Sequence, residues 1–288
     1  MMPAAAGGRS SVPPTRPVHL PGRGTAFVRE AAGPPGAPAL ILLHGVTATA
    51  ALNWFGAFGP LAEHFRVVAP DLRGHGRGLR ARPHFRLADC ADDVAALAGV
   101  LGIDRAIVVG YSMGGLVAQL TWYRHPALVS GLVLCATARN FRGSPLERIV
   151  AVSLPGFATA ARLNPLWHLV GAGVLGSHLL EGVDDPAIAR WARSEMDLTS
   201  LATVAGALDE VVGFTSHEWI PRLDVPAAVV VTSRDRVVPP SRQRRLAAAI
   251  PHAVVHALDG DHGVCVNAPA RFGAAVRDAC HAVVAAPV

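Results

Sequence analysis

Lysine is absent from this chain of 288 residues, so all 26 of its basic residues are arginine. They outnumber the 21 acidic residues and give a formal charge of +5. The arginines are scattered, and their densest groups, within residues 77–82 and 242–245, hold only three each. A nucleic-acid-binding surface needs a concentrated basic face. We therefore expect no nucleic-acid partner.

Cysteine and long apolar runs are also scarce. The four cysteines form no C-x-x-C pair and show no metal-ligand spacing with histidine, so we expect free thiols packed as small apolar residues, at Cys90, Cys135, Cys265 and Cys280. No apolar run reaches the roughly 18 residues of a membrane span. Residues 1–21 lack the apolar core of a signal peptide, so we expect a cytoplasmic protein. No metal, nucleotide or flavin motif is visible, so no cofactor is expected.

Apolar residues make up 51% of the chain and charged residues 16%, which favours a large buried core over disorder. Short apolar runs alternate with segments of helical periodicity. Such alternation is typical of a parallel sheet covered on both faces, a mostly parallel doubly wound α/β fold. Predicted strands cover Ala39–Leu43, Arg66–Ala69, Arg105–Gly110, Val129–Cys135, Ala227–Thr232 and Ala253–Ala257, and predicted helices cover Leu87–Leu101, Ser112–His125, Pro240–Ile250 and Pro269–Val284.

The stretch from residue 138 to residue 221 breaks this rhythm. It is helix-rich, it is interrupted by Pro155, Pro165 and Pro186, and it contains no clear strand. We interpret it as a helical cap inserted over the strand ends. The α/β core then comprises residues 16–137 and 222–288, and residues 1–15 form a flexible tail.

The strongest local motif is the segment Gly110–Gly115, with the sequence GYSMGG. It follows a predicted strand and opens a predicted helix, which is the context of a nucleophile elbow. A turn this sharp strains the backbone of Ser112 and leaves no room for side chains at Gly110 and Gly114. A glycine-rich turn whose serine only caps the helix is the alternative. The context favours Ser112 as a catalytic nucleophile.

A nucleophilic serine needs a base, and its position in the chain selects one of the 13 histidines. His262 follows the last predicted strand, so it lies at the same edge of the sheet as Ser112. His75 also lies in a loop at this edge and is the main competitor. The remaining candidates lie within or beside predicted helices, namely His64, His84, His125, His178 and His252.

The imidazole in turn needs a carboxylate that fixes its tautomer. Asp235 follows the penultimate predicted strand by three residues, although pairing with a neighbouring arginine would also explain it. The chain order Ser112, Asp235, His262 matches the order expected for a triad on this fold. Asp209 and Glu210 lie in the helical insertion and are poorer candidates.

The tetrahedral intermediate requires backbone donors for its oxyanion. Met113 follows the nucleophile at the start of a helix, so its N–H is one candidate. The loop that begins His44-Gly45 would supply the other, from Val46 or alternatively from Thr47. We therefore expect an oxyanion hole formed by Val46 and Met113.

Taken together, these motifs resemble the α/β-hydrolase superfamily from about residue 16 to residue 285. The matching segments are His44-Gly45, Asp71–Gly76, Gly110–Gly115, Asp235 and His262. The resemblance makes Asp71–Gly76 a structural hallmark, which argues against a catalytic His75. The elbow is similar to those of bacterial esterases, monoacylglycerol-lipase-like enzymes, cofactor-free haloperoxidases and carbon–carbon bond hydrolases. Serine argues against dehalogenases and epoxide hydrolases, which use aspartate there. Asp261 departs from the glycine common at that position.

The resemblance implies a carboxylesterase or lipase-like enzyme acting on an apolar acyl substrate. We expect the substrate to contact Tyr111, Trp167 and Trp191, with the insertion lining the acyl pocket. An acyltransferase, thioesterase or carbon–carbon bond hydrolase would use the same triad. A binding protein without turnover is a third alternative, and it is disfavoured because every catalytic position holds a competent residue. No sequence feature indicates an oligomeric state.

Overall fold

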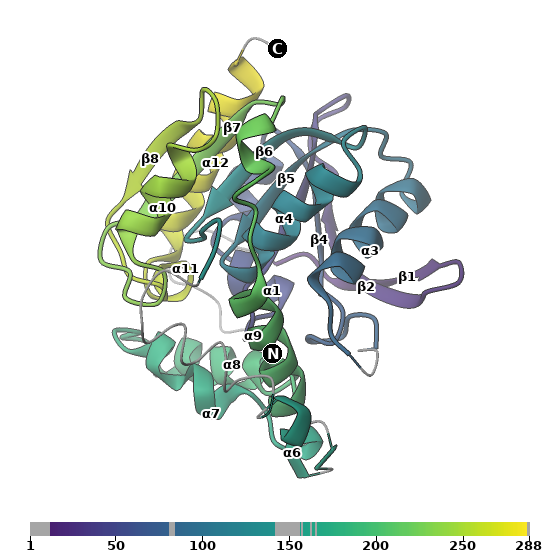
Figure 1. The fold of residues 1–288 in the computed structure, drawn as a ribbon, viewed down its shortest axis with the longest axis vertical. Helices are drawn as coiled ribbons and strands as arrows, with labels where there is room; N and C mark the ends of the chain where they lie inside the picture. The colour runs from purple at the N-terminus through teal and green to yellow at the C-terminus, as the bar shows by residue number, and fades with distance from the viewer. Residues whose placement is uncertain are drawn as a thin grey trace.

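The computed structural model describes residues 12–80, 84–141, 156, 158–161, 163–164 and 166–286. A sheet of eight strands forms its centre, in the order β1-β2-β4-β3-β5-β6-β7-β8 (Figure 1). The six strands from β3 to β8 run parallel, which confirms the predicted fold class. The strands are β1 (Thr15–Leu20), β2 (Gly24–Ala31), β3 (Ala39–Leu43), β4 (Arg66–Pro70), β5 (Ala106–Tyr111), β6 (Val129–Cys135), β7 (Ala227–Thr232) and β8 (Val254–Leu258).

Two strands at one edge were not predicted. β1 and β2 form an antiparallel hairpin, and β2 pairs antiparallel with β4. Thr15, placed at the end of the predicted tail, already belongs to β1, and residues 1–11 lie outside the described part of the chain. The hairpin has only a half-buried face, so it lacks the continuous apolar run that marks the inner strands.

The inner strands send alternate side chains to the two faces of the sheet, as the period of two requires. Ile41 and Leu43 pack with α3 and α4, whereas Leu40 and Leu42 pack with the opposite helices. The first face is covered by α3 (Leu87–Val100), α4 (Met113–Arg124) and α10 (Pro240–Ala247), and the second by α1 (Ala50–Trp54), α2 (Phe58–Ala62), α11 (Val264–Asn267) and α12 (Pro269–Ala285). All four cysteines are buried and free, as predicted.

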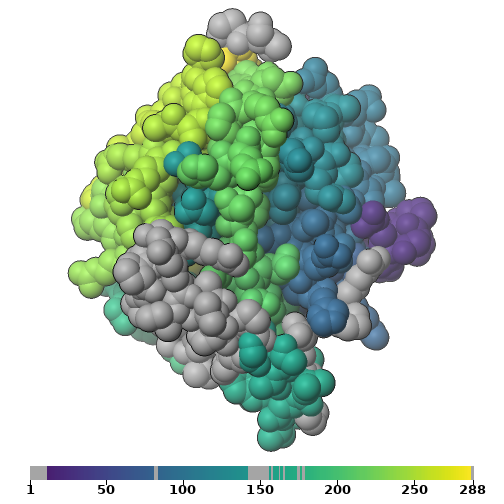
Figure 2. Space-filling model, in the orientation of Figure 1, coloured from purple at the N-terminus to yellow at the C-terminus, as the bar shows by residue number. Residues whose placement is uncertain are grey.

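Helices replace strands between β6 and β7. This stretch contains α6 (Leu166–Leu169), α7 (Gly173–Gly176), η1 (Ser177–Leu180), α8 (Pro186–Met196), α9 (Leu201–Gly213) and η2 (Ile220–Arg222). Its described residues form no strand beyond two isolated bridges. Helices α6 to α9 gather at one end of the molecule, and the chain after α9 then runs back along the core (Figures 1 and 2). Pro155 and Pro165 lie outside the described residues.

Side chains of the insertion hold it to the core at both of its long helices. Glu195 on α8 accepts a hydrogen bond of 2.5 Å from the hydroxyl of Thr49, which also caps α1. Glu210 on α9 accepts one of 3.0 Å from the N–H of Leu87 at the start of α3. Glu210, a poor catalytic candidate by sequence, therefore has a structural partner. No helix among the described residues is long and apolar enough to cross a membrane.

Candidate active site

Ser112 lies at the turn between β5 and α4, with φ 54° and ψ −117°. A side chain at Gly110 would place its Cβ 2.3 Å from the carbonyl oxygen of Gly114, and one at Gly114 would come 2.1 Å from that of Leu43. Contacts this short exclude any residue but glycine at both positions. The Ser112 carbonyl also accepts a hydrogen bond of 2.8 Å from the Thr137 hydroxyl. The close packing at the two glycines and the hydrogen bond from Thr137 together maintain the strained conformation of Ser112, as is common at active sites.

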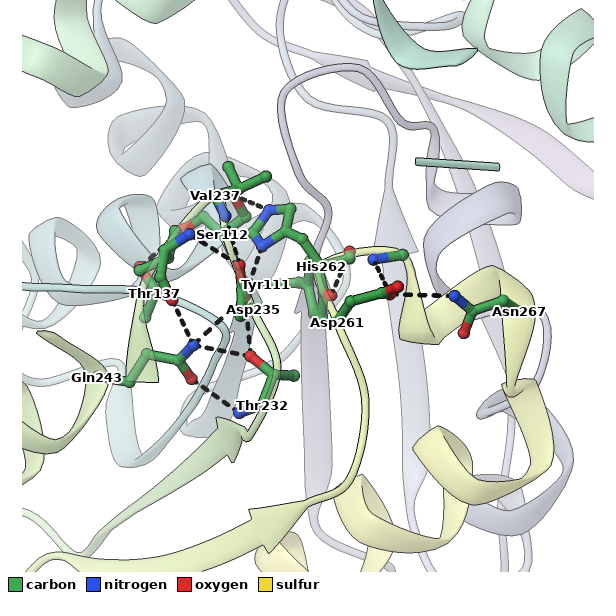
Figure 3. Close-up of polar contacts among 12 residues, drawn as sticks. Tyr111, Ser112, Thr137, Thr232, Asp235, Val237, Gln243, Asp261, His262 and Asn267 are labelled. Atoms are coloured by element: carbon green, nitrogen blue, oxygen red, sulfur yellow. Dashed lines mark hydrogen bonds and ion pairs between the residues drawn. The ribbon is translucent and has the colours of Figure 1, made fainter. Parts of the chain in front are cut away.

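The structure brings Ser112, His262 and Asp235 into one line of contacts (Figure 3). The Nε2 atom of His262 is 3.0 Å from the Ser112 Oγ, and its Nδ1 is 2.8 Å from the Asp235 Oδ2. The histidine is 8% exposed and the aspartate 3%. The carboxylate therefore receives the Nδ1–H, which leaves Nε2 free to accept the hydroxyl proton.

Four further donors orient the Asp235 carboxylate. Its Oδ1 accepts from the N–H groups of Val237 and Val238 at 2.9 and 2.8 Å. Its Oδ2 accepts from the Thr232 hydroxyl at 2.8 Å and from the Gln243 amide at 3.3 Å. Both oxygens are thus fully engaged, and neighbouring Arg234 pairs instead with Asp259 at 2.9 Å.

Sequence reasoning did not identify Gln243. Its amide nitrogen donates to the Thr232 hydroxyl and to the Val238 carbonyl, both at 2.7 Å, and its oxygen accepts from the Thr232 N–H at 3.0 Å. The available signal was its spacing in α10, because it precedes buried Leu246 and Ala247 by three and four residues. That spacing puts a polar side chain on the core-facing side of an arginine-rich helix.

The loop after β3 is held by a neutral histidine. The Leu72 N–H donates to the His44 Nε2 at 2.9 Å, so the ring proton is on Nδ1, which donates to the Gly45 carbonyl at 2.8 Å. Burial lowers the pKa of His44 from 6.5 to about 4. In a trans peptide the C=O and the next N–H point in opposite directions, so the Val46 N–H points away from His44.

The other predicted donor, the Met113 N–H, lies in the first turn of α4, where backbone N–H groups have no acceptor within the helix. Both Val46 and Met113 line the cavity that contains Ser112. His75 is not brought to the triad. It is buried, its ring contacts that of His44 with 5.4 Å between the centroids, and burial lowers its pKa to about 4.

A cavity of about 400 Å³ opens onto Ser112. The described residues that line it include no aspartate, glutamate or arginine. One wall consists of aliphatic side chains from α9, with Phe141 and the Val237-Val238 pair beside it. The lining of this cavity from α9 is Val204, Leu208, Val211 and Val212.

Of the three predicted substrate contacts, only Tyr111 lines this cavity. Its hydroxyl donates to the His262 carbonyl at 2.7 Å, so it holds the histidine loop. Trp191 packs against Phe55 with 5.2 Å between the ring centroids, and Trp167 packs against small residues of the insertion. Neither tryptophan reaches the cavity, because α9 presents aliphatic residues to Ser112 and the aromatic rings fill contacts of the insertion.

Asp261, the departure from the common pattern, points away from Ser112 (Figure 3). Its Oδ1 accepts from the Gly263 N–H at 2.8 Å and from the Asn267 amide at 3.0 Å. The side chain therefore braces the turn into α11. Within the described part of the chain, no cluster of histidine, cysteine and carboxylate side chains could hold a metal ion.

Comparison with known proteins places this fold among hydrolases. Residues 38–269 match the alpha/beta hydrolase fold family. An uncharacterised protein of Mycobacterium tuberculosis is 29% identical over 284 residues, covering 92% of this chain and 80% of that protein. A bifunctional esterase/perhydrolase of Acinetobacter calcoaceticus is 29% identical over 195 residues, covering 62% and 67%. The crystal structure of the enol-lactonase from Burkholderia xenovorans LB400 is 25% identical, with a TM-score of 0.72, covering 92% of this chain and 100% of that one.

Proposed function

Because the chain belongs to the alpha/beta hydrolase fold family, we propose that it is a serine hydrolase that cleaves an ester, or a related acyl bond, through an acyl-enzyme on Ser112. The observation that carries the proposal is the chain of contacts from Asp235 through His262 to Ser112, at 2.8 and 3.0 Å. A solvated or structural serine does not require such a partner.

The proposed mechanism follows from these positions. His262 takes the proton of Ser112 as its Oγ attacks the carbonyl carbon, and the N–H groups of Val46 and Met113 stabilise the oxyanion. The C–O bond to the leaving alcohol then breaks, and His262 returns the proton to that alcohol. Water, deprotonated by the same histidine, hydrolyses the acyl-enzyme and regenerates Ser112.

The cavity supports a small, uncharged and largely apolar substrate. Its volume of about 400 Å³ is near the lower end of the range for small-molecule sites. A charged substrate group would be desolvated there, and the described lining residues include no aspartate, glutamate or arginine to pair with it. Two of the similar proteins are named as an esterase and an enol-lactonase. Esters and lactones both contain a carbonyl group bonded to oxygen, which agrees with an ester or lactone as the substrate here. Residues 138–221 would cap this site.

Two measurements test the proposal. p-Nitrophenyl esters of increasing acyl length should be hydrolysed with an optimum at short or medium chains, and Ser112→Ala should abolish the activity. A fluorophosphonate should label Ser112 stoichiometrically. Labelling without ester turnover would favour a thioester or carbon–carbon bond substrate, or an acyl acceptor other than water. A folded protein that shows neither labelling nor turnover would contradict the proposal.

A further inference from the structure

Asn53 on α1 combines an engaged oxygen with an unpaired nitrogen. Its Oδ1 accepts a hydrogen bond of 2.9 Å from the Gly45 N–H. Its Nδ2 has no hydrogen-bond partner among the described residues, and the side chain is 1% exposed. Because the Gly45 N–H needs an acceptor, the oxygen and nitrogen of this amide cannot be exchanged. Asn53 therefore keeps two buried N–H groups for which the described residues provide no acceptor.

This amide lies beside the reacting centre. Asn53 lines the same cavity as Ser112 and the oxyanion loop. A Cβ built on Gly45 would be 3.5 Å from the Ser112 Cβ and 3.6 Å from the Asn53 Oδ1, so one glycine separates the two side chains. The Asn53 amide and the Ser112 side chain therefore lie on either side of Gly45.

A buried donor without a partner is rare and calls for an explanation. Trp54 is also unpaired at its Nε1, but Trp54 does not line the cavity, and its ring is held by packing against Tyr111 and Phe272. Asn53, in contrast, lines the cavity. Supporting Gly45 requires only an acceptor, so the NH₂ group of Asn53 is superfluous for that support.

We propose that the Asn53 Nδ2 is a specificity-determining donor for a neutral oxygen acceptor of the substrate, such as an ether, keto or second ester oxygen, next to the reacting carbonyl. The acceptor is neutral because the described residues of the lining include no arginine that would compensate an anion. The inference deepens the proposed function and rests on it. The preferred substrate then has an oxygen-bearing end toward α1 and an apolar end toward α9.

Two pairs of esters that differ only by an oxygen in place of a methylene test the proposal. p-Nitrophenyl methoxyacetate and butyrate place it on the acyl side, and 2-methoxyethyl butyrate and n-butyl butyrate place it on the alcohol side. The ratio of kcat/KM within a pair is compared between wild type and variants, so the intrinsic reactivity of each ester cancels. Asn53→Leu should lower the ether preference about tenfold for at least one pair.

Two further variants separate recognition from support of the loop. Asn53→Asp at pH 8 keeps an oxygen for the Gly45 N–H and removes the NH₂ group, so it should lose the same preference. Thr47→Val removes the hydroxyl of another cavity residue and should change the ratio less than twofold. An Asn53→Leu variant that slows both esters of each pair equally, together with an Asn53→Asp variant that retains the ratio, would overturn the proposal.

A binding measurement keeps the inference testable without turnover. In a Ser112→Ala background, benzyl methoxyacetate should bind more tightly than benzyl butyrate by calorimetry, and Asn53→Leu should remove the difference. An unchanged ratio of Kd values would overturn the role of Asn53 in folded protein, with folding checked by the melting temperature. If wild type hydrolyses no ester and Ser112 resists fluorophosphonate, the proposed function fails, and this Kd ratio alone decides the role of Asn53.

Discussion

The proposed triad and the α9 wall of the cavity are built in different ways. Ser112, Asp235 and His262 follow β5, β7 and β8 at the carboxyl edge of the sheet, and hydrogen bonds hold each residue from more than one direction. The described part of α9 presents only aliphatic side chains to the cavity. The hydrogen bonds fix the positions of the polar atoms at the sheet edge, whereas α9 contributes an apolar surface to the cavity.

This difference indicates a division of roles. Hydrogen bonds are directional, so the sheet edge can hold the reacting atoms in the geometry that catalysis needs. Apolar contact is non-directional and scales with buried area, so α9 can select substrates by size without fixing their orientation. Variants of the triad should therefore slow every substrate, and variants of α9 should change which substrate is preferred.

The largest expected effect is the loss of the reacting pair. Ser112→Ala and His262→Ala should each lower kcat by about 10⁵- to 10⁶-fold, and the double variant should cost no more than either alone, because the two residues act as a unit. Steady-state hydrolysis of one p-nitrophenyl ester checks this. Additive losses in the double variant would show that His262 is not the base for Ser112.

Asp235→Asn should cost less, about 10³- to 10⁴-fold in kcat. The serine and its base remain in place, but the imidazole loses the acceptor that fixes its tautomer. The same esters measure the effect, and the loss should be equal for all acyl lengths. A loss that varies with acyl length would contradict the separation of chemistry from selection.

The inner strands and the elbow were predictable because their signals are local. Continuous apolar runs mark buried parallel strands, and GYSMGG combines a strand end, two obligatory glycines and a helix start within six residues. His262 and Asp235 followed from their positions after two such strands. The edge hairpin β1–β2 was missed because a half-exposed strand has no such run.

The contacts around the site were not predictable from local patterns. Gln243 and Asn53 each form hydrogen bonds with residues outside their own helices, and the sequence around each of them does not indicate which partner it has. Trp167 and Trp191 illustrate the same limit, because helical spacing does not indicate which face of the helices between β6 and β7 is oriented toward Ser112. Tertiary packing selected the aliphatic face of α9.

The buried histidines His44 and His75 should make stability depend on pH. Burial lowers the pKa values of His44 and His75 from 6.5 to about 4, so the unfolded chain binds more protons than the folded one between these values. Stability should be fully present above pH 6.5 and fall as the pH drops toward 4, by up to about 3 kcal/mol for each histidine. Urea unfolding of Ser112→Ala between pH 4.5 and 7 measures this, and His75→Gln should reduce the slope. A flat profile would contradict the neutral histidine pair.

The smallest expected effect separates the two regions most directly. Leu208→Ala enlarges the cavity at the α9 wall, so longer acyl chains should gain relative to short ones, with the hexanoate-to-butyrate ratio of kcat/KM rising about three- to tenfold. Leu201→Ala is the matched control, because it makes the same change on the same helix outside the cavity lining. A shift in Leu201→Ala equal to that in Leu208→Ala would attribute the effect to helix stability. A uniform loss for both esters in Leu208→Ala would mean that α9 supports the reacting atoms, and the division between geometry from the sheet and selection by the cap would then fail.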